Sequence, residues 1–206
     1  NLIPRFYDAT KGSVKIDGVD VRDYPLSELR DKIGYVPQQT ALFSGTLRDN
    51  MKWGNSQADD AQIMRALELA QAADFVSALP DGLDTAVSQG GRNFSGGQRQ
   101  RLTIARALVR DPEIVILDDS ASALDFATDL ALRRALRKGL SGATVFIVSQ
   151  RASSIRHADK IIVLDKGVAV GIGTHAALIE ECEVYREIVM SQEDKEENNG
   201  KEASHE

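Results

Sequence analysis

Residues Phe94–Arg101 read Phe-Ser-Gly-Gly-Gln-Arg-Gln-Arg, and Ile114–Asp119 read Ile-Val-Ile-Leu-Asp-Asp. A serine and two glycines ahead of apolar residues at spacings of three and four predict a capped helix over 95–109. An unbroken apolar run that ends in two carboxylates predicts a buried strand. Because α/β sheets bind ligands at the carboxyl ends of their strands, the two stretches predict an α/β fold with a site at the sheet edge.

Apolar patterning extends this prediction to the rest of the chain. The unbroken apolar runs 114–117 and 144–148 flank a helix predicted over 125–140, a pattern typical of a parallel sheet covered on both faces. Helical spacing over 46–79 and 95–109 predicts a helical lobe over 45–110. The other expected elements are a strand at 33–36, helices at 27–32, 176–181 and 184–190, and hairpins joining 14–16 to 19–21 and 161–164 to 168–170.

Length and composition fit one domain. The chain has 206 residues, 42% of them apolar, which is enough for one substantial core, and we expect this domain over 1–191. The polar and charged stretch 192–206 is predicted to be a disordered tail. No apolar run reaches the roughly 20 residues that a membrane-spanning helix needs.

Charge and cysteine content argue against other classes. A net charge of −6 without a long Lys/Arg run argues against a nucleic-acid binder, because neutralising phosphates needs a basic face. Cys182 is the single cysteine, so the chain needs no oxidising compartment and a cytosolic location is expected. The three histidines form no metal-binding pattern.

Each motif also has a plain structural explanation. Ser95 could serve only as a helix N-cap. Asp118 could be only the end of an ordinary strand, and Gln38 only a loop residue that follows Pro37. Asp125 precedes a predicted helix and is expected to cap it, whatever else it does. The prediction of a nucleotide site therefore depends on the motifs occurring together and in order.

Taken together, the motifs resemble those of the ATP-binding-cassette (ABC) ATPases. Ser95–Gln98 resembles their signature motif, Ile114–Asp118 their Walker B strand, Ser122–Asp125 their D-loop and Tyr35–Gln38 their Q-loop. The order is that of the family, and the resemblance covers 1–191. It implies a P-loop NTPase-like parallel sheet with a helical signature lobe, and ATP and Mg²⁺ as ligands.

The resemblance also implies a role for each motif residue. Asp118 would hold Mg²⁺, and Gln38 would contact Mg²⁺ and water. Nucleotide contacts are implied for Gln38 and for the signature and D-loop residues, namely Ser95, Gly96, Gly97, Gln98 and Asp125. In this family the signature closes over the γ-phosphate held by a second nucleotide-binding domain. The implied partner is therefore such a domain, and the signature contacts are made in trans.

Two positions depart from the family pattern. Asp119 stands where the family has its catalytic glutamate, and Gln150 where it has a histidine that contacts the γ-phosphate. Aspartate is one methylene shorter than glutamate, and a general base needs to lie about 2.6–3.2 Å from its proton donor. Glutamine can hydrogen-bond but cannot carry a positive charge or shuttle a proton. The chain's own catalytic site is therefore expected to be impaired.

The phosphate-binding loop of the family is absent from this sequence. No Gly-x-x-x-x-Gly-Lys-Ser/Thr occurs, and residues 1–7 have the character of the last turns of a helix without an N-cap. We therefore expect a piece of a longer polypeptide that lacks its N-terminal β part and follows a transmembrane domain. Such a piece is expected to bind ATP weakly by itself and to be inactive in isolation.

Residues 41–50 resemble the stretch of exporter-type ABC proteins that faces the coupling helices of the transmembrane domain. Phe43 is the expected docking residue there. Ordinary core packing of Phe43 is the alternative.

The sequence thus predicts one half of a heterodimeric exporter-type ABC transporter at the cytoplasmic face of the membrane. Its own site would be degenerate, and its signature would complete the active site of its partner. A regulatory cassette that binds ATP without hydrolysing it is a second possibility. A DNA-maintenance ATPase would carry long heptad helices between the Q-loop and the signature, and no heptads occur between Gln38 and Ser95.

Overall fold

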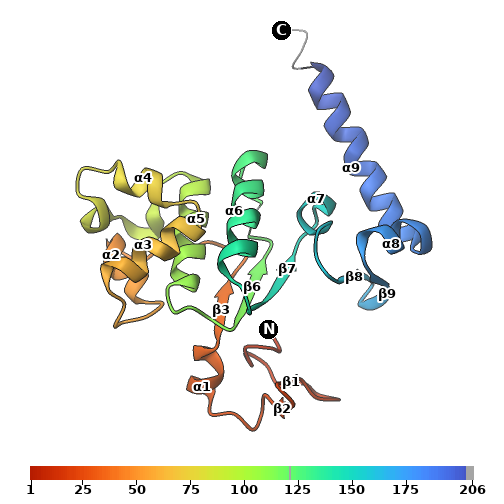
Figure 1. Ribbon diagram of the computed structural model, residues 1–206, viewed down its shortest axis with the longest axis horizontal. Coiled ribbons are helices and arrows are strands. Elements are labelled where there is room, and N and C mark those ends of the chain that lie inside the picture. Colours follow the sequence, from red (N-terminus) through yellow and green to blue (C-terminus); the bar gives the residue numbers. More distant parts are fainter. Residues whose placement is uncertain (121, 203–206) are drawn as a thin grey trace. The chain divides into compact units, whose positions relative to one another are not determined.

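The chain divides into two compact units, Asn1–Val148 and Ser149–Glu206, and the computed structural model describes residues 1–120 and 122–202 (Figure 1). We call them the N-terminal unit and the C-terminal unit. The range 1–191, for which the sequence predicts one domain, is divided after its third parallel strand. Each unit is described by itself.

A three-stranded parallel sheet in the order β3-β6-β7 forms the centre of the N-terminal unit. These strands are Ile33–Val36, Ile114–Asp118 and Thr144–Val148, as the apolar runs predict. Val36 pairs with Leu117, and Leu117 pairs with Ile147. The carboxyl ends of all three strands therefore share one edge, and the predicted α/β fold with a parallel sheet is confirmed.

The central strand β6 and its neighbour β7 differ in burial. β6 is buried over 114–117, with Val115 and Leu117 in one core cluster and Ile114 and Ile116 in another. β7 is mostly exposed. The expectation that both strands are covered on both faces is wrong for β7, because within the described residues only its Ile147 packs against the main core and its other four residues are exposed.

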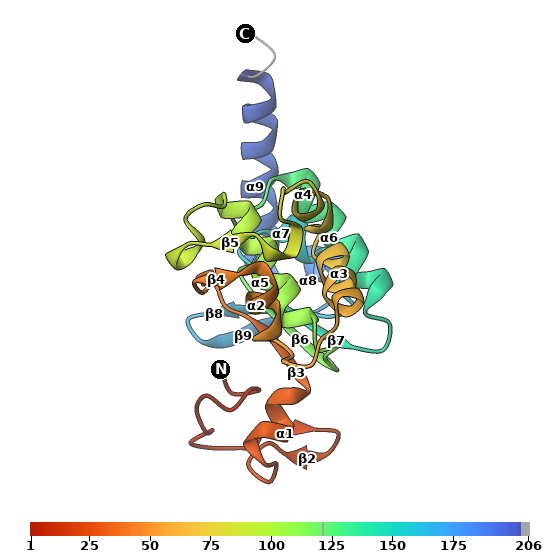
Figure 2. The ribbon, with the colours of Figure 1, turned by 90° about the vertical axis from the view of Figure 1, so that its left-hand side faces the viewer.

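The helical lobe of the N-terminal unit occupies the range for which the sequence predicts one (Figures 1 and 2). The predicted helical stretch 46–79 is divided, because capping boxes at Thr46 with Asp49 and at Asp59 with Gln62 start separate helices. The lobe comprises α2 (Leu47–Lys52), α3 (Asp60–Leu69), α4 (Ala73–Ser77), α5 (Gly96–Leu108), the antiparallel pair β4 (Gly45–Thr46) and β5 (Ala86–Val87), and 3₁₀ turns at Gly82–Asp84 and Gln89–Gly91.

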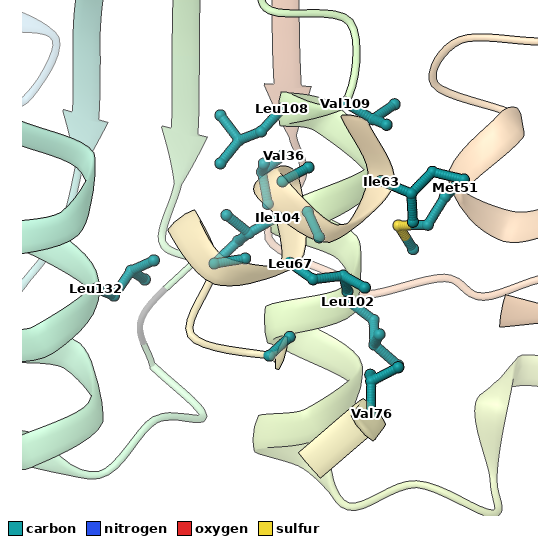
Figure 3. Packing of buried hydrophobic residues seen from close by; sticks show 14 of the residues in the cluster. Val36, Met51, Ile63, Leu67, Val76, Leu102, Ile104, Leu108, Val109 and Leu132 are labelled. Atoms are coloured by element: carbon teal, nitrogen blue, oxygen red, sulfur yellow. The ribbon is translucent and has the colours of Figure 1, made fainter. Parts of the chain in front are cut away.

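Helix α5 connects this lobe to the sheet through the main core (Figure 3). Its Leu102 and Ile104 are fully buried in one cluster with Ile63 of α3 and Val36 of β3. Helix α6 (Phe126–Gly139), which joins β6 to β7 along the chain, contributes Leu132 and Leu136 to the same cluster. The position of the α5 N-terminus is therefore set by a packed core.

Ile104→Ala is expected to lower the free energy of unfolding by about 2–5 kcal/mol, because it leaves a cavity at a fully buried position. Leu26→Ala, at a residue that is 44% exposed, is the control and should cost less than about 1 kcal/mol. Urea unfolding of the two variants measures both values. Equal losses would contradict the central position of Ile104 in the core.

The second face of the sheet is covered by a hairpin and a short helix. These are β1 (Lys15–Ile16), β2 (Val19–Asp20) and α1 (Leu26–Asp31), which confirm the predicted elements. Their apolar side chains form a cluster with strands β3 and β6, comprising Ile16, Val21, Leu29, Ile33, Ile114 and Ile116. Residues 1–7 form turns rather than the expected helix end, and Arg5 has a left-handed backbone with a φ of 52°.

The described part of the C-terminal unit, residues 149–202, contains a hairpin and three helices. They are α7 (Ala152–Ile155), β8 (Ile161–Asp165), β9 (Val168–Gly173), α8 (His175–Glu181) and α9 (Glu183–Glu202). The predicted turn at Lys166 and Gly167 is confirmed, and both residues have positive φ, as a tight hairpin turn requires. Strands and helices share a core that includes Val163, Leu178 and Tyr185.

Helix α9 continues beyond its predicted end. Its backbone is helical as far as Glu202, within the segment 192–206 for which the sequence predicts disorder, and residues 203–206 lie outside the described residues. Glu and Lys, which are frequent in this segment, have good helix propensity. Across the described part of the chain, no helix has both the length and the apolar character needed to cross a membrane.

Candidate functional site

The N-terminus of α5 presents the signature residues. Ser95 is the N-cap, and its Oγ accepts a hydrogen bond from the Gln98 N–H at 3.2 Å. In return, the Oε1 of Gln98 accepts a hydrogen bond from the Ser95 N–H at 2.9 Å. The plain explanation of Ser95 as a cap is thus confirmed, and Gln98 belongs to the same capping box. The N–H groups of Gly96 and Gly97 lie in the first turn, where a helix offers them no acceptor.

The signature lies directly against the D-loop of the same chain. A Cβ on Gly97 would lie 3.3 Å from the carbonyl oxygen of Ala123, and a Cβ on Gly96 would lie 4.0 Å from the Cβ of Ala123. Glycine at 97 therefore allows the helix end and the loop to approach closely. The sequence predicts both motifs, and the structure brings them together at one end of α5.

Arg101 holds the first turn of α5 in place. Its guanidinium donates to the carbonyl oxygens of Gln71 at 2.6 Å and Gly97 at 3.4 Å, and it stacks 4.8 Å from the centre of the Phe75 ring. Burial lowers the pKa of this guanidinium, while the charge of Asp125 acts in the opposite direction. Arg101 thus connects the signature turn to the chain between α3 and α4, a contact that spacing along the sequence does not reveal.

At the carboxyl edge of the sheet, Asp118 is the last residue of β6. Its Oδ2 accepts a hydrogen bond from the Tyr35 hydroxyl of the neighbouring strand β3 at 3.2 Å. Burial, followed by the charge and hydrogen bond of Asp118, raises the pKa of Tyr35, so the phenol stays protonated as the donor. Gln38 follows the end of β3 and is exposed at the same edge. The structure thus brings Asp118 and Gln38 to adjacent strand ends.

Asp119 has an unusual backbone. Its φ is 46°, in the left-handed region, where aspartate is better tolerated than most residues. Its N–H donates to the carbonyl of Val148 at 2.9 Å, and its carbonyl accepts from the Ser122 hydroxyl at 3.1 Å. Among the described residues of the N-terminal unit, nothing hydrogen-bonds to its carboxylate. The backbone at the proposed catalytic position is therefore fixed while the carboxylate is available to a ligand.

Asp125 caps α6, as its plain structural explanation predicts. Its carboxylate accepts hydrogen bonds from the Thr128 N–H at 2.9 Å and the Thr128 hydroxyl at 2.8 Å. These two bonds lower the pKa of Asp125. A capped α6 fixes the end of the D-loop beside the signature.

Gln150 lies in the C-terminal unit, one residue before the N-cap of α7. Its carbonyl oxygen accepts a hydrogen bond from the side-chain amide of Gln192 in α9 at 2.7 Å. Asp119, the other position that departs from the family pattern, belongs to the N-terminal unit.

An exposed aromatic pair lies on the lobe. Phe43 and Trp53 are 44% and 67% exposed, with ring centres 4.8 Å apart. The amide of Asn50 fixes the Phe43 backbone by bonds to its N–H and C=O at 2.9 and 2.8 Å, and Arg106 lies against the Phe43 ring. Ordinary core packing, the alternative for Phe43, does not match this exposure. Sequence reasoning missed Trp53, although a tryptophan in a polar stretch was a visible signal.

The donor set at the sheet edge fits Mg²⁺ bound together with a phosphate. Mg²⁺ is usually held by one or two carboxylates, with substrate phosphates and water completing its coordination. Asp118 supplies a carboxylate, and Tyr35 is the hydrogen-bond donor to one of its two oxygens. When bound, the ion would neutralise phosphate charge. Asp118 would hold it, and Gln38 would supply an amide oxygen.

Comparison with known proteins identifies this arrangement. A solved structure of a bacterial Atm1-family ABC exporter with ATP bound superposes with a TM-score of 0.88 and 37% identity, over 93% of this chain and 34% of that chain. The fold is therefore that of an ABC exporter nucleotide-binding domain. The ABC transporter family model matches residues 1–122, more than half of the sequence. The chain belongs to the ABC transporter family.

Two relatives also indicate that the chain belongs to the ABC transporter family. An uncharacterized ABC transporter ATP-binding protein of Mycobacterium tuberculosis is 47% identical over 195 residues, which is 93% of this chain and 33% of that protein. An ATP-dependent lipid A-core flippase of Desulfotalea psychrophila is 44% identical over 179 residues, 87% of this chain and 31% of the flippase. The chain spans about a third of the length of these proteins.

Proposed function

We propose that this chain is the nucleotide-binding part of an ABC exporter that couples ATP binding and hydrolysis to transport across a membrane. The observation that carries this proposal is the capped α5 N-terminus against the D-loop, because exposed first-turn N–H groups and the helix dipole favour a phosphate. The similarity to a lipid A-core flippase and to an Atm1-family exporter supports it. The chain would work at the cytoplasmic face of the membrane, joined to a transmembrane domain.

The chain's own site is proposed to be degenerate. The Asp119 side chain is one methylene shorter than glutamate, and hydrogen bonds to the Asp119 N–H and C=O fix its backbone. The carboxylate therefore has a shorter reach toward the attacking water. Gln150 supplies a neutral amide where a histidine would carry charge. Asp118 and Gln38 keep the groups that hold Mg²⁺ and water, so ATP binding at this site is retained while hydrolysis is slow or absent.

The signature is proposed to act in trans. Ser95, Gly96 and Gly97 are exposed or half-buried at the end of α5, where a second nucleotide-binding domain can approach. We infer that this partner differs in sequence and carries a complete catalytic set. The pair would then be a heterodimer with one active site and one degenerate site. The 206-residue chain alone, without the phosphate-binding loop, is expected to bind ATP weakly and to be inactive.

The docking surface for the transmembrane domain is proposed to be the aromatic pair Phe43 and Trp53. Exposed aromatic side chains on a rigid support are typical centres of protein interfaces. Here the support is Asn50, which is 1% exposed and holds the Phe43 backbone from α2. Because Phe43 follows the Q-loop by five residues, the same segment links this surface to Gln38.

Trp53→Ala is expected to lower transport and substrate-stimulated ATP hydrolysis by about 30-fold, since loss of an aromatic interface anchor typically costs about 2 kcal/mol. The measurement uses the complete transporter in lipid vesicles. Tyr7→Ala is a matched control, because Tyr7 is 68% exposed and Trp53 is 67% exposed. Full coupling in Trp53→Ala would contradict docking at this surface. Failure of the unsubstituted transporter to couple ATP hydrolysis to transport would contradict the proposed function.

A further inference from the structure

One face of helix α9 lines the core of the C-terminal unit. Tyr185 and Val189 are 2% and 7% exposed and belong to its apolar cluster, together with Ala152 of α7. Gln192 follows Val189 by three residues, so it lies on the same helix face. The apolar stripe therefore ends in an amide directed at the segment that contains Gln150.

The Gln192 side chain forms hydrogen bonds with the backbone on both sides of Arg151. Its Nε2 donates to the carbonyl of Gln150 at 2.7 Å, and its Oε1 accepts from the Ala152 N–H at 2.8 Å. The second bond satisfies a first-turn N–H of α7, whose N-cap residue Arg151 makes no side-chain cap bond to the helix. One side chain thus fixes a donor and an acceptor that are two residues apart, as a neighbouring strand would.

We propose that Gln192 is a positioning residue for Gln150, acting through this two-bond clamp on residues 150–152. The inference rests on the proposed role of Gln150 at the γ-phosphate. It goes beyond that role because it makes the C-terminal helix part of the catalytic apparatus. Gln192 does not touch the nucleotide. It sets the backbone from which the side chain at 150 extends, and its loss allows that side chain to leave its working position.

Hydrogen–deuterium exchange tests the clamp itself. In the complete transporter, Gln192→Met keeps the length of the side chain and removes both bonds, so the Ala152 amide is expected to exchange about fivefold faster. Amides of α8, which pack on the same core, should keep their protection. Glu187→Met introduces the same side chain at an exposed site of α9 and is the matched control. Unchanged exchange at Ala152 in Gln192→Met would overturn the clamp, whatever the function of the chain.

ATP turnover tests whether the clamp affects hydrolysis at this chain's own site. The variant Asp119→Glu/Gln150→His is expected to hydrolyse ATP faster at this site, and adding Gln192→Met should remove at least half of that gain, whereas adding Glu187→Met should remove none. Gln192→Glu keeps the acceptor for the Ala152 N–H and should give an intermediate loss. A gain that persists in full with Gln192→Met overturns the positioning role. Absence of any gain in Asp119→Glu/Gln150→His overturns the proposed degenerate site instead, and the exchange result still decides the clamp.

Discussion

Asp119→Glu combined with Gln150→His is expected to raise ATP hydrolysis at this chain's own site by about 10- to 100-fold, because a positioned general base contributes about 10²–10⁴-fold to a reaction. Glutamate adds one C–C bond, about 1.5 Å, to the reach of the carboxylate. Histidine at 150 supplies a group that can carry a positive charge near pH 7. The measurement is single-turnover hydrolysis in the complete transporter, with the partner's site inactivated.

The backbone at 119 calls for a specific control in this experiment. Its φ of 46° favours aspartate over glutamate, so the substitution strains the backbone as well as lengthening the side chain. Asp111 has a φ of 54° and is exposed, so Asp111→Glu reproduces the backbone strain away from the site. If Asp111→Glu leaves stability and turnover unchanged, a missing gain at 119 and 150 cannot be assigned to backbone strain. That result would contradict the degenerate-site proposal.

Ser95→Ala is expected to lower hydrolysis at the partner's site by about 10²-fold, the usual effect of removing one donor aimed at charge that develops in the transition state. Hydrolysis at the chain's own site should hardly change. The same substitution also removes a helix cap, which costs about 1 kcal/mol of stability. The two effects have to be measured separately, by site-resolved turnover and by thermal unfolding.

Asp59→Ala separates the effect of losing a helix cap from the effect of losing the signature contact. Asp59 and Gln62 form a capping box at the start of α3 in the same lobe, like that of Ser95 and Gln98 at the start of α5. Asp59→Ala should therefore lower stability by a similar amount and leave turnover at the partner's site close to the unsubstituted value. Equal turnover losses in both variants would show that the signature acts through lobe stability alone.

Much of the fold could be predicted because apolar patterns are local. The strands at 33–36, 114–118 and 144–148 and the helix after Ser95 follow from runs and spacings within a few residues. The exposure of β7 could not be predicted in this way, since burial depends on what packs against the faces of a strand rather than on its own residues. The start of α3 depends on the capping box of Asp59 and Gln62, whose residues are visible in the sequence, whereas α4 begins at Ala73 without a side-chain cap.

The sequence predicts which residues form the candidate site, and it does not predict the contacts among them. The order of the motifs predicts Asp118, Ser95 and Gln38 as site residues, and the structure places Asp118 and Gln38 at one sheet edge. Tyr35 and Asp118 are 83 positions apart, so their hydrogen bond follows only from the pairing of β3 with β6. The hydrogen bond from the Asp119 N–H to the Val148 carbonyl likewise follows only from the pairing of β6 with β7, which no local pattern encodes.

The most direct test of the central claim is site-resolved single-turnover hydrolysis by the complete transporter with Mg-ATP, blocking each of the two composite sites in turn. With this chain's own site blocked, hydrolysis should continue at nearly the full rate. With the partner's site blocked, it should fall by about 10-fold or more, as expected for a missing general base. Equal rates at the two sites, or full-speed hydrolysis by a pair made only of this polypeptide, would contradict the account.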